Sequence, residues 1–286
     1  MDLGKTLQLS GRSVSYIDQG KGETLLLIHG FPLDHSMWQR QIDFFQASYR
    51  VVCPDLPGFG ASDPLDGLGI STEVGDADSL SMDKLADWLA EFLDAIDCKQ
   101  PVNYCGLSMG GYVGWQFWRR HAWRLKSIIA ANTRAANDEE LVRRARHMAA
   151  AQVRVLGVQP VADAMVKKLF YLADELNPLD VDYIANVHQT ILTTQPASIS
   201  AGQIGMSQRG DATAWLGEIE IPMLFVGGEF DEITPPAEMQ ANADAVGNAV
   251  GNARFESIPA AGHLTPLEQP DAFNTVVGCF LEREVH

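Results

Sequence analysis

The chain has 286 residues, 46% of them hydrophobic and 20% charged, and a formal net charge of −16. This length and composition are typical of a globular protein with one large α/β domain or two smaller ones. The acidic balance excludes the Lys/Arg-rich surfaces through which proteins bind nucleic acids or anionic membranes, so we expect neither as a partner.

Three further features of the sequence indicate where the protein works and whether it binds a metal. The first 16 residues lack the basic and apolar segments of a signal peptide, and no apolar run is long enough for a membrane span. Cys53 and Cys105 fall within apolar runs, as small core residues do in a reducing cytosol. Neither the four cysteines nor the seven histidines have a metal-binding spacing. We therefore expect a cytoplasmic protein with no metal and no cofactor.

The first 131 residues predict alternating strands and helices. Residues 6–10 and 13–18 alternate in polarity around a Gly-Arg pair, which predicts an edge hairpin. Ser81 is the predicted N-cap of a helix from Met82 to about Ile96. Continuous apolar runs, typical of strands buried on both faces of a parallel sheet, lie at Thr24–Ile28, Tyr49–Cys53 and Leu125–Ala131.

A loop at residues 63–79 contains five acidic side chains and three glycines. Calcium ligation is one interpretation of such a loop, but the spacing of its acids is not that of an EF-hand. The spacing favours a solvated acidic loop.

Strand patterns stop between Asn132 and about Gly217, and helical patterns replace them at about 138–156, 161–172, 179–193 and 197–208. Alternation resumes with strands at Ile219–Val226 and Arg254–Ile258, each followed by a helix. Two strands are too few for a second core. We therefore predict an α/β fold with one mostly parallel sheet, formed by residues 1–132 and 217–286, flanked by helices and carrying an inserted helical cap at 133–216.

The pentapeptide Gly106-Leu-Ser-Met-Gly110 stands between a β-rich run and a helical pattern. In that context G-x-S-x-G predicts a nucleophile elbow, a sharp strand-to-helix turn that lifts the serine hydroxyl clear of the sheet. The glycines avoid clashes at this strained turn. The N–H of Met109, at the start of the helix, would point at developing negative charge.

A serine nucleophile needs an adjacent base, and the base needs an orienting carboxylate. Two later loops, each after a predicted strand, offer these groups: Asp231 lies in the first and His263 in the second. Ligands bind outside the carboxyl ends of parallel strands, where both loops are expected. Glu229 and Glu232 remain alternatives for the carboxylate.

The chain resembles the α/β-hydrolase fold superfamily over essentially its whole length. Five of its motifs match in the family's order: His29-Gly-Phe-Pro32, Asp55-Leu-Pro-Gly-Phe-Gly-Ala-Ser62, Gly106-Leu-Ser-Met-Gly-Gly111, the loop from Gly228 to Pro235, and Gly262-His263. Within the superfamily, the third motif resembles the branch of 3-oxoadipate enol-lactonases, bacterial non-haem perhydrolases and small carboxylesterases.

The resemblance implies roles for individual residues. Ser108 would be the nucleophile, His263 the general base and then acid, and Asp231 the carboxylate that orients the imidazole. The N–H groups of Phe31 and Met109 would form the oxyanion hole.

Two other positions in the family's motifs have no expected part in the proton transfers. His29, at the turn before Phe31, would be structural. Some members carry the acid at the end of the strand that here closes with Asn132, whose neutral amide cannot stabilise an imidazolium by charge.

The predicted function is therefore a serine hydrolase that cleaves carboxylic ester or lactone bonds of a small molecule through an acyl-enzyme. A carbon–carbon bond hydrolase acting next to a ketone is one alternative, and a non-catalytic small-molecule receptor that keeps the triad is another. In the cap, Met148 and Phe170 are candidate substrate-binding residues, with packing between cap helices as the alternative.

Overall fold

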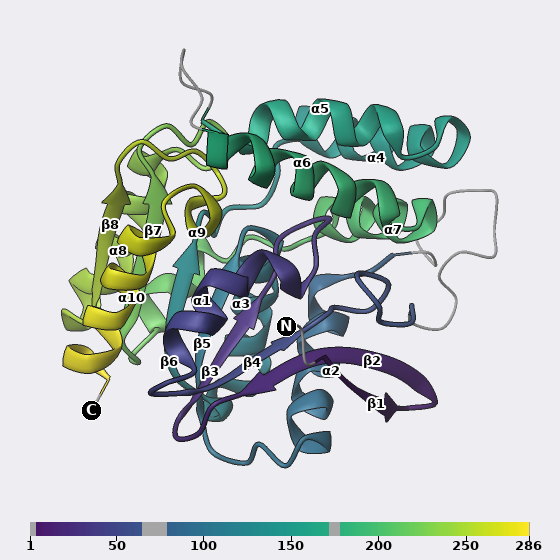
Figure 1. Cartoon of the computed structure of the whole chain (residues 1–286). Helices are drawn as coiled ribbons and strands as arrows, with labels where there is room; N and C mark the ends of the chain where they lie inside the picture. The colour runs from purple at the N-terminus through teal and green to yellow at the C-terminus, as the bar shows by residue number, and fades with distance from the viewer. Residues whose placement is uncertain (1–3, 65–78, 172–177, 286) are drawn as a thin grey trace.

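A computed structural model describes residues 4–64, 79–171 and 178–285. An eight-stranded sheet in the order β1-β2-β4-β3-β5-β6-β7-β8 crosses the molecule, with helices on both faces (Figure 1). Only the pairs β1–β2 and β2–β4 are antiparallel. The strands are β1 (Lys5–Leu9), β2 (Arg12–Gln19), β3 (Thr24–Ile28), β4 (Arg50–Pro54), β5 (Val102–Leu107), β6 (Leu125–Ala131), β7 (Met223–Gly228) and β8 (Ala253–Ile258). The predicted mostly parallel sheet and edge hairpin are confirmed.

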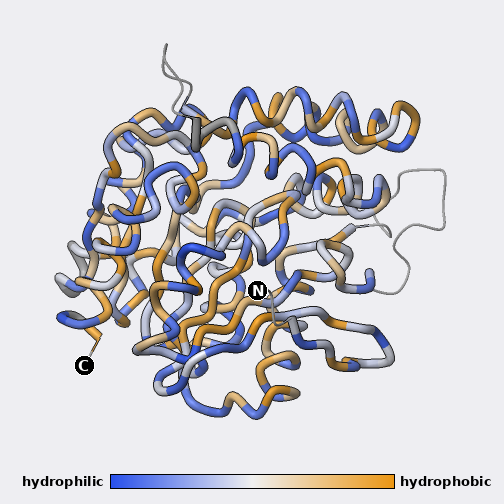
Figure 2. Tube along the Cα trace, viewed as in Figure 1, coloured by the Kyte–Doolittle hydropathy of each residue, from blue (hydrophilic) through white to orange (hydrophobic). Residues whose placement is uncertain are grey.

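The central strands are buried along nearly their whole length and mostly apolar, and much of their trace is orange in Figure 2. Successive residues of β3 contribute to opposite faces, with Leu26 and Ile28 in one hydrophobic cluster and Leu25 and Leu27 in the other. Because both faces are covered, a continuous apolar run rather than an alternating one is required.

The helices of the sheet layers are α1 (Gln39–Phe45), α2 (Met82–Ala95), α3 (Met109–His121), α8 (Pro236–Val250), α9 (Thr265–Glu268) and α10 (Pro270–Glu284). Side chains of α2, α3 and α8 pack in the cluster on one face, and those of α1 and α10 pack on the other. The sequence missed α1, α9 and the 3₁₀ helix η1 (His35–Trp38). All three are a few residues long, too short for a helical period to stand out.

Two local predictions differ from the structure. Strand β7 begins at Met223, not Ile219, because Pro222 has no N–H for the ladder and a 3₁₀ helix, η4 (Thr213–Glu218), precedes it. Ser81 does occupy the N-cap of α2, but its side chain makes no capping hydrogen bond.

Four helices, α4 (Glu140–Leu156), α5 (Gln159–Leu169), α6 (Pro178–Thr193) and α7 (Pro196–Ser207), lie between β6 and β7 in the chain. This α4–α7 segment lies over the end of the sheet to which the parallel strands point (Figure 1). The acidic loop predicted at 63–79 falls, apart from its first two residues and its last, outside the described residues. Among the helices of residues 4–64, 79–171 and 178–285, none is both long and apolar enough to cross a membrane.

Candidate active site

Ser108 stands between β5 and α3 with φ 53° and ψ −112°, a strained conformation for a residue with a side chain. The flanking glycines leave no room for a side chain. A Cβ on Gly106 would lie 2.5 Å from the carbonyl of Gly110, and one on Gly110 would lie 2.4 Å from the carbonyl of Ile28. The backbone of the elbow is fixed further by Thr133, whose hydroxyl donates to the Ser108 carbonyl at 2.8 Å.

A continuous chain of hydrogen bonds joins the three residues that the sequence singled out. The Ser108 Oγ lies 2.9 Å from Nε2 of His263, and Nδ1 of His263 lies 2.8 Å from Oδ2 of Asp231. His263 and Asp231 are buried, at 2% and 3% exposure. The carboxylate therefore holds the tautomer in which Nε2 is free to accept a proton from the hydroxyl.

Asp231 is held as a carboxylate by its surroundings. Burial alone would raise its pKa, but the adjacent His263 and hydrogen bonds from His263, Asn132 and Thr234 outweigh it and lower the pKa well below its ordinary value. The backbone N–H groups of Ile233 and Thr234 donate to Oδ1 at 2.8 and 3.0 Å. Oδ2 is left to face the imidazole. An ionised, fixed carboxylate is what stabilisation of an imidazolium requires.

Close backbone approach brings the acid loop and the histidine loop together. A Cβ on Gly228, the last residue of β7, would lie 2.0 Å from the carbonyl of Gly262. Neither alternative acid reaches the imidazole in this arrangement. Glu229 accepts from the N–H of Ala260 at 3.2 Å, and Glu232 is exposed.

Asn132 has a part that the sequence did not reveal. It lies at the end of β6 with φ 44°, a conformation that Asn tolerates better than most residues. Its amide donates to Oδ2 of Asp231 at 2.9 Å and to the carbonyl of Gly262 at 3.2 Å, while Thr265 donates to its carbonyl oxygen at 2.6 Å. The neutral residue at this strand end thus holds the acid of the next strand. Its position at the carboxyl edge of the sheet, next to the expected loops, is the sequence feature from which this role could have been predicted.

Glu268 is a second residue that the sequence reasoning missed. Its carboxylate accepts from the N–H groups of Gly262 and Leu264, on either side of His263, at 3.0 Å each. It also accepts from the N–H of Tyr171, just after α5, at 2.7 Å. Burial raises the pKa of Glu268, and the three N–H donors oppose that shift. One side chain therefore fixes both the histidine loop and the end of α5.

His29 is fixed by hydrogen bonds on both ring nitrogens. Nδ1 lies 2.9 Å from the carbonyl of Gly30, and Nε2 accepts from the N–H of Leu56 at 3.0 Å. Because a carbonyl accepts and an N–H donates, this pattern fits the neutral imidazole, and burial lowers the pKa of His29 accordingly. The ring therefore joins the turns after β3 and β4. Neither of its two hydrogen bonds is to Ser108.

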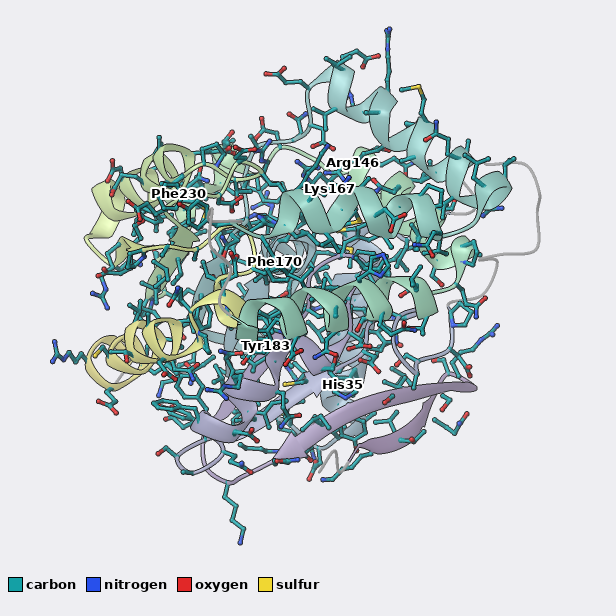
Figure 3. All side chains as sticks on the ribbon, turned by 45° about the horizontal axis from the view of Figure 1, so that its top comes forward. His35, Arg146, Lys167, Phe170, Tyr183 and Phe230 are labelled. Carbon is teal, nitrogen blue, oxygen red and sulfur yellow. The ribbon has the colours of Figure 1, made fainter. Side chains whose placement is uncertain are left out.

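The two candidate substrate-binding residues lie in different places. Phe170 is buried, at 8% exposure, between α5 and α6 (Figure 3), and its backbone packs against Gly262 beside His263. Met148 is 61% exposed on α4. The structure therefore brings Phe170 to the buried histidine loop, whereas Met148 faces solvent.

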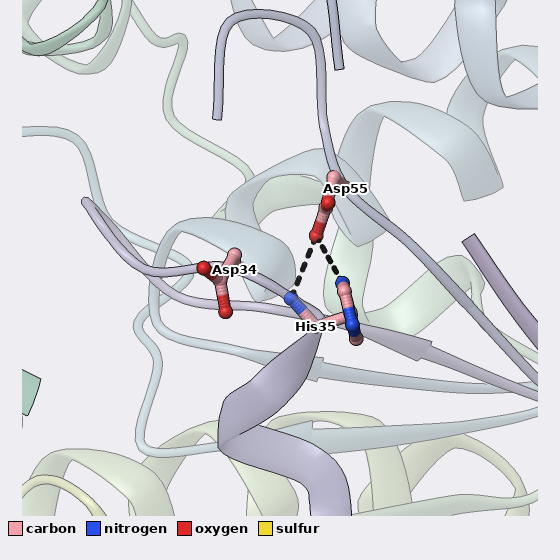
Figure 4. A group of neighbouring side chains, drawn as sticks. All are labelled: Asp34, His35 and Asp55. Carbon is pink, nitrogen blue, oxygen red and sulfur yellow. Dashed lines mark hydrogen bonds and ion pairs between the residues drawn. The ribbon is translucent and has the colours of Figure 1, made fainter. Parts of the chain in front are cut away.

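One group of ligand-type side chains among the described residues has the spacing of a metal site: Asp34, His35 and Asp55 (Figure 4). The buried carboxylate of Asp55 accepts from the N–H and ring of His35, at 2.8 and 2.7 Å, and from the N–H of Ala61 at 3.0 Å. Asp34 caps η1 by accepting from the N–H of Ser36. These oxygens already serve to fix two turns, and we interpret the group as structural.

Comparison with known proteins places the chain in a family. A model of the alpha/beta hydrolase fold matches residues 23–270. The chain therefore belongs to the α/β-hydrolase fold family.

Individual relatives match over nearly the full length. A 3-oxoadipate enol-lactonase of Acinetobacter baylyi is 29% identical over 97% of this chain and 96% of its own length. A thermophilic esterase from Thermogutta terrifontis has 32% identity and a TM-score of 0.88 over all of both chains. The enol-lactonase of Burkholderia xenovorans LB400 has 25% identity and a TM-score of 0.83, covering 98% of this chain and 100% of its own.

Proposed function

We propose that this chain is a serine hydrolase that cleaves carboxylic ester or lactone bonds of a small molecule through an acyl-enzyme on Ser108. The observation that carries the proposal is the unbroken hydrogen-bond chain from Ser108 through His263 to Asp231. Full-length relatives with esterase and enol-lactonase activity support the choice of bond.

In the first half-reaction the Ser108 Oγ attacks the substrate carbonyl carbon while Nε2 of His263 takes its proton. Asp231 stabilises the resulting imidazolium. The tetrahedral intermediate collapses by breaking the carbonyl carbon–oxygen single bond, and His263 protonates the departing oxygen. In a lactone that oxygen stays attached to the acyl chain.

In the second half-reaction a water molecule attacks the acyl-enzyme and gives its proton to His263. Collapse of the second tetrahedral intermediate releases the carboxylic acid, and the proton returns to Ser108. The same imidazole thus serves as base and then acid in each half.

Two backbone N–H groups would stabilise the oxyanion that forms in both halves. Met109 is the first residue of α3, so its N–H has no partner within the helix and points from the positive end of the helix dipole. Phe31 follows Gly30, where an added Cβ would lie 3.6 Å from the Cβ of Ser108. Both residues thus adjoin Ser108, one in the chain and one across the turn after β3, where an oxyanion hole would need its donors.

The α4–α7 segment would act as a cap, residues 133–216, on a core formed by 1–132 and 217–286. Hydrogen bonds tie it to loops on two sides of Ser108. The carbonyl of Leu169 accepts from the N–H of His263 at 3.0 Å, and the hydroxyl of Thr194 donates to the carbonyl of Pro32 at 3.2 Å. A cap fixed in this way excludes water from the reacting groups and shapes the pocket.

Covalent labelling together with a substrate panel tests the proposal. A fluorophosphonate should modify Ser108, as located by mass spectrometry, and Ser108→Ala should prevent labelling. The purified protein should hydrolyse p-nitrophenyl acetate or butyrate, or simple lactones, with kcat at least about 10³-fold above that of Ser108→Ala. Labelling at another residue would refute the assignment of the nucleophile. Labelling at Ser108 without turnover of any ester or lactone would refute the choice of bond.

A further inference from the structure

The side of helix α4 that packs on the protein holds polar side chains beside the buried Ala150 and Val153. Three of its polar side chains bond to α7: Arg154 donates to Ser200, Arg146 donates to Gln203, and His147 shares a hydrogen bond with Ser207. Arg146 also pairs with the buried Asp138 at 2.6 Å. In an ordinary surface helix these charged groups would face water.

The opposite side of α4 carries an exposed apolar stripe, which we define as Leu141, Met148, Val155 and Leu156. Their exposed fractions are 79%, 61%, 82% and 62%. Single exposed apolar residues are normal, but four on one helix face form a patch that usually marks an interaction surface. In Figure 1 α4 lies with α5 at the outer side of the α4–α7 segment, away from the sheet.

We propose that the apolar stripe of α4 is a dimer interface in which it packs antiparallel against the same stripe of a second copy. Leu141, Met148 and Val155 are seven residues apart, so they lie in one line along about 21 Å of helix. The line is symmetric about Met148. A two-fold axis there sets Met148 against its counterpart and Leu141 against Val155 of the second copy, as an isologous interface requires. The intervening Ala145 and Ala151 are small enough for close helix packing.

Charge and area favour a second copy over a lipid surface. The chain as a whole is strongly acidic, but the charges beside the stripe balance one another: Glu139 and Glu140 offset Arg143 and Arg144, and Glu140 pairs with the two arginines at 2.9 and 2.7 Å. Two copies can therefore approach without like-charge repulsion. The antiparallel arrangement also places Arg144 near the negative end of the partner helix. Covering both stripes removes roughly 1,000 Å² from water, about the least that a biological interface needs and the size of a weak, reversible one.

Sedimentation equilibrium of the full chain at about 1–100 µM tests the proposal, and the expected mass is that of two chains. Met148→Glu places two carboxylates on the two-fold axis and should weaken association at least about 100-fold. The matched control is Trp123→Glu, because Trp123 is also a large apolar residue, 67% exposed, but lies outside the stripe. This control should leave the mass unchanged, and circular dichroism should confirm that both variants are folded.

Cysteine cross-linking tests the register in a Cys279→Ser background, since the three other cysteines are buried. Met148→Cys should cross-link to itself under mild oxidation. Leu141→Cys should do so poorly alone but efficiently when mixed with Val155→Cys.

Three results would overturn the proposal. The first is a single-chain mass for the unaltered protein over the whole concentration range. This holds also if that single chain binds phosphatidylcholine vesicles through the stripe. The second is a dimer that survives Met148→Glu. The third is a cross-linking pattern in which Leu141→Cys pairs with itself better than Met148→Cys does.

Discussion

Two histidine–aspartate pairs lie at the same end of the sheet and differ in what surrounds them. Nδ1 of His263 is 2.8 Å from Asp231, and Nδ1 of His35 is 2.7 Å from Asp55. Both carboxylates are buried and both have lowered pKa values, since hydrogen bonds and the adjacent imidazole outweigh the effect of burial.

The difference lies in the other bonds of each pair. Nε2 of His263 reaches Ser108, so a proton can pass between hydroxyl and imidazole. Asp55 instead accepts from the backbone of His35 and of Ala61, and so ties two turns together. A histidine–aspartate pair is therefore a candidate for proton transfer only when its second nitrogen faces a nucleophile. Elsewhere the same pair serves as a structural clamp.

The largest difference in activity between the two histidine–aspartate pairs is expected for Asp231→Asn. Loss of the charge leaves the imidazolium unsupported and allows the wrong tautomer, so kcat should fall by about 10²–10⁴-fold. Asp55→Asn should lower kcat by less than about tenfold, because its pair does not touch Ser108.

Steady-state kinetics on a p-nitrophenyl ester measures both variants of that comparison. Glu229→Gln and Glu232→Gln are the neighbouring controls and should also stay within about tenfold. A crippled Glu232→Gln beside a mild Asp231→Asn would mean that the carboxylate is wrongly assigned.

A second change would move the charge rather than remove it. The amide of Asn132 lies 2.9 Å from Oδ2 of Asp231, so a carboxylate at residue 132 comes close to the imidazole. Adding Asn132→Asp to Asp231→Asn should therefore restore kcat by about tenfold or more over the single variant. Asn132→Ala in the same background should restore nothing. Equal activity of the two double variants would show that residue 132 acts only through packing.

Strong local constraints explain how much of the site the sequence could predict. The elbow at Ser108 needs glycines at fixed positions, and the loops of Asp231 and His263 each follow a buried strand, so pattern alone placed all three at one edge. Asn132 and Glu268 escaped prediction because their roles depend on contacts between segments far apart in the chain. Sequence patterns report local periodicity and turn chemistry, and they carry little information on which loops meet.

The helices of the α4–α7 segment were predictable from their period, but the direction of their faces was not. Helix α4 turns Arg146 and Arg154 inward, against the usual rule, because Asp138 and polar partners on α7 accept them. Met148, which the sequence made a candidate for substrate binding or cap packing, is instead exposed to solvent. The apolar face of a helix is the buried one only when the polar side chains on its other face have no hydrogen-bond partners within the protein.

Substitutions in the α4–α7 segment should act on substrate choice, and more weakly. Phe170→Ala should change the ratio of kcat/KM for butyrate and acetate esters by up to about tenfold, since a methylene in an apolar pocket is worth that much. Met148→Ala, of similar chemical character but exposed, should leave the ratio unchanged. Ester panels on both variants measure the effect. A larger change with Met148→Ala would reverse our assignment of the pocket side.

The smallest effect on activity is expected at the pair of His35 and Asp55. Here the main effect should be on stability. The lowered pKa of Asp55 means that its charged form is favoured by folding. Its contribution is present in full above the unfolded value near 4, and is lost as the pH falls toward the lower folded value. Asp55→Asn should therefore reduce the free energy of unfolding by about 2 kcal/mol at pH 7.

Urea denaturation between pH 7 and pH 3 measures how that difference changes with pH. It should narrow progressively below about pH 4, because Asp55 takes up a proton in the unfolded chain there while its folded pKa is lower, and the advantage of the charged form shrinks. Asp97→Asn is the control, because Asp97 and its partner Lys99 are 82% and 77% exposed and water screens that pair. If the gap between Asp55→Asn and the unaltered protein stayed constant down to pH 3, the loss would come from altered packing. Charge would then not be what distinguishes this clamp from the pair at Ser108.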